Sequence, residues 1–300
     1  MINLPDGVNV NNLIDDLKKI SWDAADILLI YSDIIKNSQE KSQILQNNNI
    51  NDPVTLADLE VNELIIKSIN QKYPNVNWEI LSEENFKTKT NYCNQNADWL
   101  WVLDPLDGTK DFIQGTGNFA MHLALNYKRK PYIGIVLIPE KDELWISYAD
   151  KLWRENRDGS IQKQKLSETN ILNKMTVVTS KNHKNEKLKN LIKYINFKKI
   201  IVMGSIGCKV ASILRGESDI YIALSLHGKS APKDWDLAAP EAILKAAGGA
   251  ITNLDNNELC YGQPNFKQGG IIVASNNKLM HGNICSEIEE IIRKNDIYPI

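Results

Sequence analysis

Several features that define other classes of protein are missing from this sequence of 300 residues. It has only four cysteines and no CxxC pair, which excludes a zinc ribbon or thioredoxin-type motif and makes a disulfide framework unexpected. No run approaches the roughly 18 uninterrupted apolar residues of a transmembrane helix. The first residues have no basic flank before an apolar stretch, so we expect no signal peptide. These absences predict a cytoplasmic protein with no integral membrane segment, and they leave peripheral membrane attachment open.

Neither sign of charge is in large excess, because 35 basic residues stand against 37 acidic ones and the net charge is −2. This balance argues against a protein that binds a nucleic acid polymer through a broad basic surface. The 43% hydrophobic and 24% charged residues are ordinary for a globular protein, which excludes disorder of the whole chain. At roughly 100–200 residues per domain, the length predicts two domains.

The hydrophobic pattern changes along the chain. Two amphipathic helices are predicted over 13–34 and 56–70, and Thr55 and Asp58 have the spacing of a capping box at the start of the second. Strands are then predicted over 78–81, 99–103, 119–125, 132–138, 143–148 and 152–155. Strands (175–179, 199–203, 220–224, 270–274) afterwards alternate with helices (185–194, 206–214, 237–247, 279–294). The sequence therefore predicts an α+β domain over 1–165 and an α/β domain over 166–300, with the active site between them.

The segment that carries most chemistry is WVLDPLDGTK, residues 101–110. An apolar strand leads two carboxylates, Asp104 and Asp107, into a turn that Gly108 allows to close tightly. Carboxylate oxygens and the intervening Leu106 carbonyl are ligands that a hard cation such as Mg²⁺ prefers. Free N–H groups at Gly108 and Thr109 would suit a phosphate. The plainer interpretation is a simple Asp-Gly turn after a buried strand.

Three other acidic segments support a metal site, and each has a plainer interpretation. Glu83 and Glu84 follow a short apolar strand and could be a solvated loop. Asp236 stands at the start of a predicted helix and could be its N-cap. Asp58 could be only the capping-box partner of Thr55.

Together these segments resemble a known family. The ordered set DPVTLAD (52–58), SEE (82–84), WVLDPLDGTKDF (101–112) and KDWDLAAPEAILKAAGG (233–249) resembles the lithium-sensitive, magnesium-dependent phosphatases. These include inositol monophosphatase, fructose-1,6-bisphosphatase and the 3'(2'),5'-bisphosphate nucleotidases. The resemblance covers nearly the whole chain and implies an α+β fold, a layered α/β/α/β/α sandwich.

The resemblance also implies roles for individual residues. It implies two to three Mg²⁺ ions held by Glu83, Asp104, the Leu106 carbonyl, Asp107 and Asp236. It implies that Thr109 and Asp58 polarise the attacking water. We therefore expect direct in-line attack by metal-activated water without a phosphoenzyme.

Other segments favour the bisphosphate nucleotidases within this family. Lys110 follows the DGT motif where inositol monophosphatases usually have threonine. The stretches MGSIGCK (203–209) and VTSKNH (178–183) are similar to nucleotidase segments that bind anion and nucleotide. The substrate-binding residues predicted on this basis are Gly108, Thr109, Lys110, Ser180, His183, Ser205, Lys209 and Asp236. The plainer interpretation of Lys209 is an exposed helix lysine.

The resemblance implies hydrolysis of the 3'-phosphate of adenosine 3',5'-bisphosphate to AMP, with action on its sulfated analogue also expected, in the context of sulfate assimilation. One alternative is an inositol phosphatase or another sugar-phosphate phosphatase. A second is a non-catalytic sensor of nucleotide or metal with the same fold. The expected partner is a small phosphate ester, and the sequence leaves monomer and homodimer open.

Overall fold

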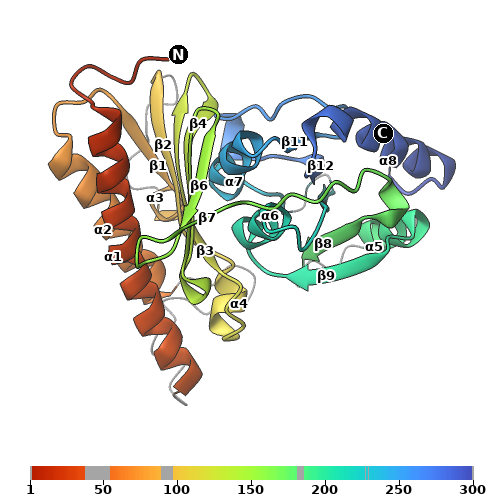
Figure 1. Ribbon diagram of the computed structural model, residues 1–300, viewed down its shortest axis with the longest axis horizontal. Helices are drawn as coiled ribbons and strands as arrows, with labels where there is room; N and C mark the ends of the chain where they lie inside the picture. The colour runs from red at the N-terminus through yellow and green to blue at the C-terminus, as the bar shows by residue number, and fades with distance from the viewer. Residues whose placement is uncertain are drawn as a thin grey trace.

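The computed structural model describes residues 2–37, 55–88, 97–180, 186–226, 228 and 230–298. Its elements form alternating layers of helices and sheets (Figure 1), which confirms the predicted layered sandwich. The helices are α1 (Val10–Asn37), α2 (Leu56–Lys72), α3 (Glu83–Thr88), α4 (Thr109–Ile113), α5 (Glu186–Ile195), α6 (Ile206–Leu214), α7 (Asp234–Ala246) and α8 (Lys278–Lys294). The strands are β1 (Glu79–Ser82), β2 (Trp99–Asp107), β3 (Ala120–Tyr127), β4 (Lys130–Ile138), β5 (Glu143–Tyr148), β6 (Lys151–Glu155), β7 (Ile161–Gln162), β8 (Thr176–Ser180), β9 (Lys199–Met203), β10 (Ile220–Ser225), β11 (Ala250–Asn253) and β12 (Gly270–Ser275).

The first sheet has seven strands in chain order, β1 to β7. Strand β1 runs parallel to β2, and the later neighbours are antiparallel. Alternate residues of β2 enter different cores: Trp101 and Leu103 pack in the core with α1 and α2, whereas Leu100 and Val102 pack in the core with α6 and α7. Because both faces are covered, this strand reads as a continuous apolar run rather than an alternating one.

The second sheet has five strands in the order β11-β12-β10-β8-β9. Strand β8 is parallel to β9 and β10, whereas β12 is antiparallel to β10 and β11. Helices α6 and α7 lie between the two sheets, and α5 and α8 cover the outer face of the second sheet (Figure 1). The first sheet ends at residue 162 and the second begins at residue 176, on either side of the predicted boundary.

Two elements differ from the sequence prediction in ways that matter for the site. Strand β2 continues to Asp107 instead of ending at residue 103, with a shift in register between Asp104 and Asp107. Pro105 lies in this shifted segment, where no ladder N–H is needed. Helix α7 starts at Asp234, earlier than the predicted residue 237, because Lys233 is its N-cap residue. No helix in the described ranges is long and apolar enough to cross a bilayer.

Candidate active site

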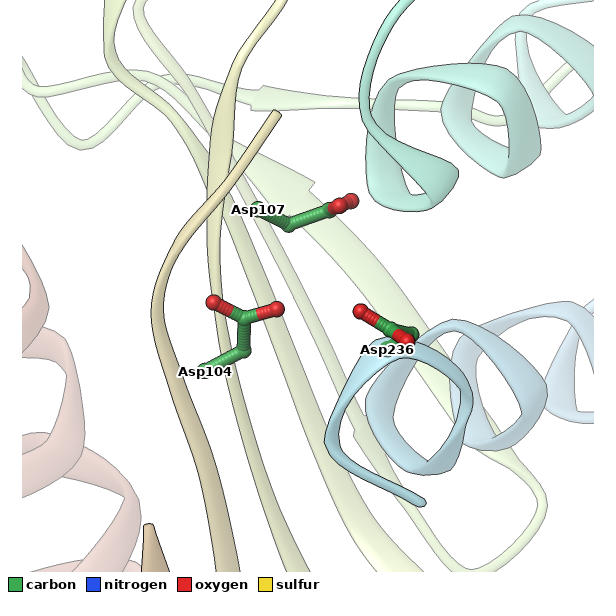
Figure 2. A group of neighbouring side chains, drawn as sticks. All are labelled: Asp104, Asp107 and Asp236. Carbon is green, nitrogen blue, oxygen red and sulfur yellow. The ribbon is translucent and has the colours of Figure 1, made fainter. Parts of the chain in front are cut away.

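Three carboxylates meet where the two halves of the chain face each other. Asp104 and Asp107 come from the irregular end of β2, and Asp236 comes from the first turn of α7. One ligand oxygen from each lies within 4.8 Å of the others (Figure 2). Asp236 is the third residue of its helix rather than the N-cap, and its Oδ2 accepts the Lys233 N–H at 2.5 Å. The plainer interpretation, in which Asp236 is the N-cap, is therefore wrong, because Lys233 is the N-cap of this helix.

Glu83 lies beside this cluster because of how its strand pairs. Strand β1 is parallel to β2 with Ser82 opposite Leu103, so Glu83 and Asp104, the next residues along the two segments, lie at the same end of this pairing. The Glu83 carboxylate raises the pKa of both Asp104 and Asp236, which places its charge next to theirs. Its interpretation as part of a solvated loop is therefore wrong, because it begins helix α3 at the acidic cluster.

An aromatic cluster holds α3 and α7 together. The ring of Phe86 lies 5.3 Å from that of Trp235 and 5.5 Å from that of Phe266, and Trp235 and Phe266 are 6.0 Å apart. Such ring contacts stabilise by about 0.5–1.5 kcal/mol beyond the area they bury. Because Glu83 begins α3 and Asp236 lies in the first turn of α7, this cluster fixes the two acids on one cleft.

The electrostatics of the cluster fit a cation. Burial raises the pKa of Asp104 well above its usual value, and the charges of Glu83 and Asp107 raise it further. Burial also raises the pKa of Asp236 well above its usual value, again with Asp107 and Glu83 adding to it. Carboxylates about 4 Å apart repel by about 4 kcal/mol at an effective dielectric near 20. An all-oxygen donor set under this repulsion fits Mg²⁺, which takes carboxylate ligands.

The DPLDGT turn has the tight geometry expected from its sequence. Gly108 has φ of +89°, and a Cβ there would lie 2.9 Å from the Asn118 carbonyl oxygen. The Leu106 N–H donates to Asp104 Oδ1 at 3.1 Å, and the Thr109 hydroxyl donates to the Leu106 carbonyl at 3.1 Å. The turn therefore fixes one of the acids and leads directly into α4.

Asp58 is buried and forms the predicted capping box with Thr55. Its Oδ2 accepts the Thr55 N–H at 2.8 Å and the Thr55 hydroxyl at 2.6 Å. Burial raises the pKa of Asp58 to about 8 against the opposing effect of the Thr55 hydrogen bonds, and the charges of Glu84 and Glu83 raise it as well. Asp58 is thus both a cap and a neighbour of the acidic groups. Its pairing with Thr109 across a water molecule stays a prediction.

A pocket of about 270 Å³ opens beside the cluster. Its wall includes the predicted metal ligand Asp107 and brings together most of the predicted substrate-binding residues, namely Gly108, Thr109, Lys110, Ser180, Ser205, Lys209 and Asp236. His183 lies outside the described residues. The lining also includes the apolar residues Leu188, Ile222 and Leu224, which the sequence analysis did not identify as site residues.

Lys209 is not the exposed helix lysine of the plainer interpretation. It is 3% exposed, and its ammonium lies 5.1 Å from the centre of the Tyr221 ring. Burial lowers its pKa, and the charge of Asp107 opposes that effect. The pocket therefore has a buried basic group in its wall, close to the acids.

His122 is a buried neighbour of the site that the sequence analysis missed. Its Nε2 lies 3.3 Å from Asp107 Oδ2, and its Nδ1 lies 3.3 Å from the Trp235 carbonyl oxygen. The residue stands within the apolar run of β3, so its sequence context resembles that of a core position. The spacing of residues along the chain gives no signal for these contacts.

The layered fold and the acidic cluster agree with the family to which the sequence is matched. The chain belongs to the inositol monophosphatase family, whose model matches residues 11–293. It is therefore a phosphoric monoester hydrolase, which removes the non-catalytic sensor from consideration. Magnesium dependence and lithium sensitivity are typical of this family.

Individual relatives agree with this assignment. The 3'(2'),5'-bisphosphate nucleotidase CysQ of Buchnera aphidicola is 33% identical over 215 residues, covering 70% of this chain and 75% of the relative. The enzyme of the same name from Aggregatibacter actinomycetemcomitans is 26% identical and covers 91% of this chain and 98% of its own. Among solved structures, the Thermotoga maritima IMPase has a TM-score of 0.72 at 21% identity, covering 94% of this chain and 99% of its own. CysQ from Bacteroides thetaiotaomicron has a TM-score of 0.67 at 22% identity, covering 85% of this chain and 94% of its own. These structures have the same fold as this chain.

Proposed function

We propose that this enzyme removes the 3'-phosphate of adenosine 3',5'-bisphosphate, giving AMP and phosphate. The observation that carries the proposal is a single pocket that joins the acidic cluster to buried Lys209. A bisphosphate has one phosphate to be cleaved and a second that needs its own positive charge. The names of the curated relatives, 3'(2'),5'-bisphosphate nucleotidases, favour the same substrate.

We propose further that two to three Mg²⁺ ions bind at the acidic cluster. We propose that the ligands are Glu83, Asp104, the Leu106 carbonyl, Asp107 and Asp236. When bound, Mg²⁺ supplies positive charge that makes water easier to deprotonate and offsets charge on the phosphoryl and leaving oxygens.

The chain itself positions the reactants. We assign Thr109 and Asp58 to orienting the attacking water, with attack in line and no covalent phosphoenzyme. Asp58 suits this role because it is buried close to Glu83 and Glu84, whose charges act on it. Lys209, Lys110 and Ser180 line the pocket and would bind the rest of the substrate. Removal of the 3'-phosphate from the sulfated analogue, and a place in sulfate assimilation, are part of the same proposal.

The proposal is tested by phosphate release from adenosine 3',5'-bisphosphate, inositol 1-phosphate and fructose 1,6-bisphosphate, side by side with and without Mg²⁺. The expected result is Mg²⁺-dependent cleavage of the nucleotide with the highest kcat/KM. A Lys209→Met variant should lose more activity on the nucleotide than on inositol 1-phosphate, because the latter has no second phosphate. A higher kcat/KM on inositol 1-phosphate, unchanged in Lys209→Met, would instead support the inositol phosphatase.

A further inference from the structure

We infer that Ser205 is a positioning residue that fixes Asp107, and that its hydroxyl does not donate a hydrogen bond to a phosphate of the substrate. This inference rests on the proposed Mg²⁺ site. It changes the role that the sequence suggested for Ser205, which was contact with the substrate.

The hydrogen bonds of the Ser205 hydroxyl carry the argument. It donates to Asp107 Oδ2 at 2.7 Å and accepts the Cys208 N–H at 3.1 Å as the cap of α6. A hydroxyl has one hydrogen to donate. Since Asp107 takes that hydrogen, an ionised phosphate oxygen of the substrate, which can only accept, would have to displace the carboxylate.

The same carboxylate oxygen has a second donor from the same helix. The Gly207 N–H donates to Asp107 Oδ2 at 3.2 Å. The positive end of α6 therefore faces Asp107, where a negative charge is favoured. With Oδ2 held in this way, Asp107 has Oδ1 left to offer a cation.

The backbone conformation of Ser205 is unfavourable for a residue with a side chain. Its φ is +36°, in the region that favours glycine, so a residue with a side chain is strained there. The site is also tightly packed, because a Cβ on Gly108 would lie 3.0 Å from the Ser205 nitrogen. Glycine would suit this backbone better than serine. The contribution of serine here is therefore its hydroxyl, which bonds Asp107.

The experiment measures Mg²⁺ affinity by calorimetry without substrate for wild type, Ser205→Gly and Ser205→Ala. Thermal unfolding confirms that each variant folds. Mutation of a residue that hydrogen-bonds to a metal ligand typically lowers the affinity for the metal 10–100-fold. We expect Kd for Mg²⁺ to rise about tenfold in Ser205→Gly and Ser205→Ala. KM for the nucleotide at saturating Mg²⁺ should change less than about twofold in both variants.

The control is Asn277→Ala, which removes the cap of α8, where the Asn277 side chain accepts the Leu279 N–H. It should leave Mg²⁺ affinity unchanged, so that loss of a helix cap alone does not account for the effect. Unchanged Mg²⁺ affinity in Ser205→Gly and Ser205→Ala, with or without a higher KM, overturns the inference. Wild-type protein that binds Mg²⁺ but cleaves no nucleotide contradicts the proposed substrate. A tenfold loss of Mg²⁺ affinity in Ser205→Gly would support the role of Ser205 even in that case.

Discussion

A methyl group on Gly207 would place its carbon 2.2 Å from Nε2 of His122 and 2.8 Å from Cγ1 of Val136. Both neighbours are fully buried, so neither has room to move away. We therefore expect Gly207→Ala to lower the free energy of unfolding by about 1–3 kcal/mol, as overpacking in a core does. Urea unfolding measures this. The matched control is Gly269→Ala, because nothing lies within 4 Å of a Cβ at Gly269, and equal destabilisation by both changes would contradict the account.

Asp107→Asn keeps the size of the side chain and removes its charge. The amide oxygen can still accept from Ser205, so the fold should persist, whereas a charged cation ligand is lost. We expect kcat/KM to fall at least about 100-fold, because electrostatic stabilisation by a metal is worth several kcal/mol. Circular dichroism checks folding and phosphate release checks turnover. A folded variant with wild-type Mg²⁺-dependent activity would refute the assignment of Asp107.

At this scale the sequence predicts residues that lie in one continuous motif better than contacts between distant ones. Asp104, Asp107 and Gly108 lie within five residues along a strand and turn. The local sequence was therefore enough to predict that the two acids could bind a metal and that the turn is tight. The bond from Ser205 to Asp107 joins residues 98 positions apart, and no local pattern encodes it. The burial of Lys209 likewise depends on the second sheet packing over α6.

At the scale of elements, His281 ties α8 to the second sheet. Its Nδ1 lies 2.7 Å from the Ser275 hydroxyl and its Nε2 lies 2.8 Å from that of Thr252. Because Thr252 donates its own hydrogen to the Asn253 carbonyl, it accepts from Nε2–H, and Ser275 donates to Nδ1. A neutral ring satisfies this arrangement completely, and burial lowers the His281 pKa to about 4.

The depressed His281 pKa predicts a loss of stability in acid. Below the unfolded pKa of about 6.5 the unfolded chain binds a proton that the folded chain does not, so stability falls as pH drops from there toward 4. The loss should be about 2 kcal/mol at about pH 5 relative to about pH 7.5. Urea unfolding at both pH values should show this extra loss in wild type and not in His281→Gln. Equal pH dependence of the two proteins would refute the role of His281.

The periodic elements were readily predicted and the irregular ones were not. Helix α1 has a sustained apolar face, and its observed range, Val10–Asn37, contains the predicted 13–34. Strand β11 was missed because its four residues follow α7 closely. Strand β7 was missed because its two residues are exposed and lie in a polar stretch. The extension of β2 to Asp107 passes through a proline, which by itself suggests a strand end.

At the scale of the whole molecule, the acids of the two halves repel each other across the cleft. Asp104 and Asp107 belong to the first half and Asp236 to the second. Bound Mg²⁺ should therefore stabilise the folded chain, by about 2.7 kcal/mol at one hundred times Kd. We expect the melting temperature to rise by several degrees with Mg²⁺ in wild type and clearly less in Asp107→Asn. Equal shifts in the two proteins would indicate that Mg²⁺ binds elsewhere.

The central claim is that this cleft removes the 3'-phosphate of a nucleoside bisphosphate. Phosphorus-31 NMR of the reaction with adenosine 3',5'-bisphosphate and Mg²⁺ identifies the phosphate that leaves and the product that remains. The account predicts inorganic phosphate and adenosine 5'-phosphate in equal amounts, with no reaction once the Mg²⁺ is chelated. Formation of adenosine 3'-phosphate would contradict it. An unchanged spectrum, with the enzyme shown to be folded at the temperature of the reaction, would also contradict it.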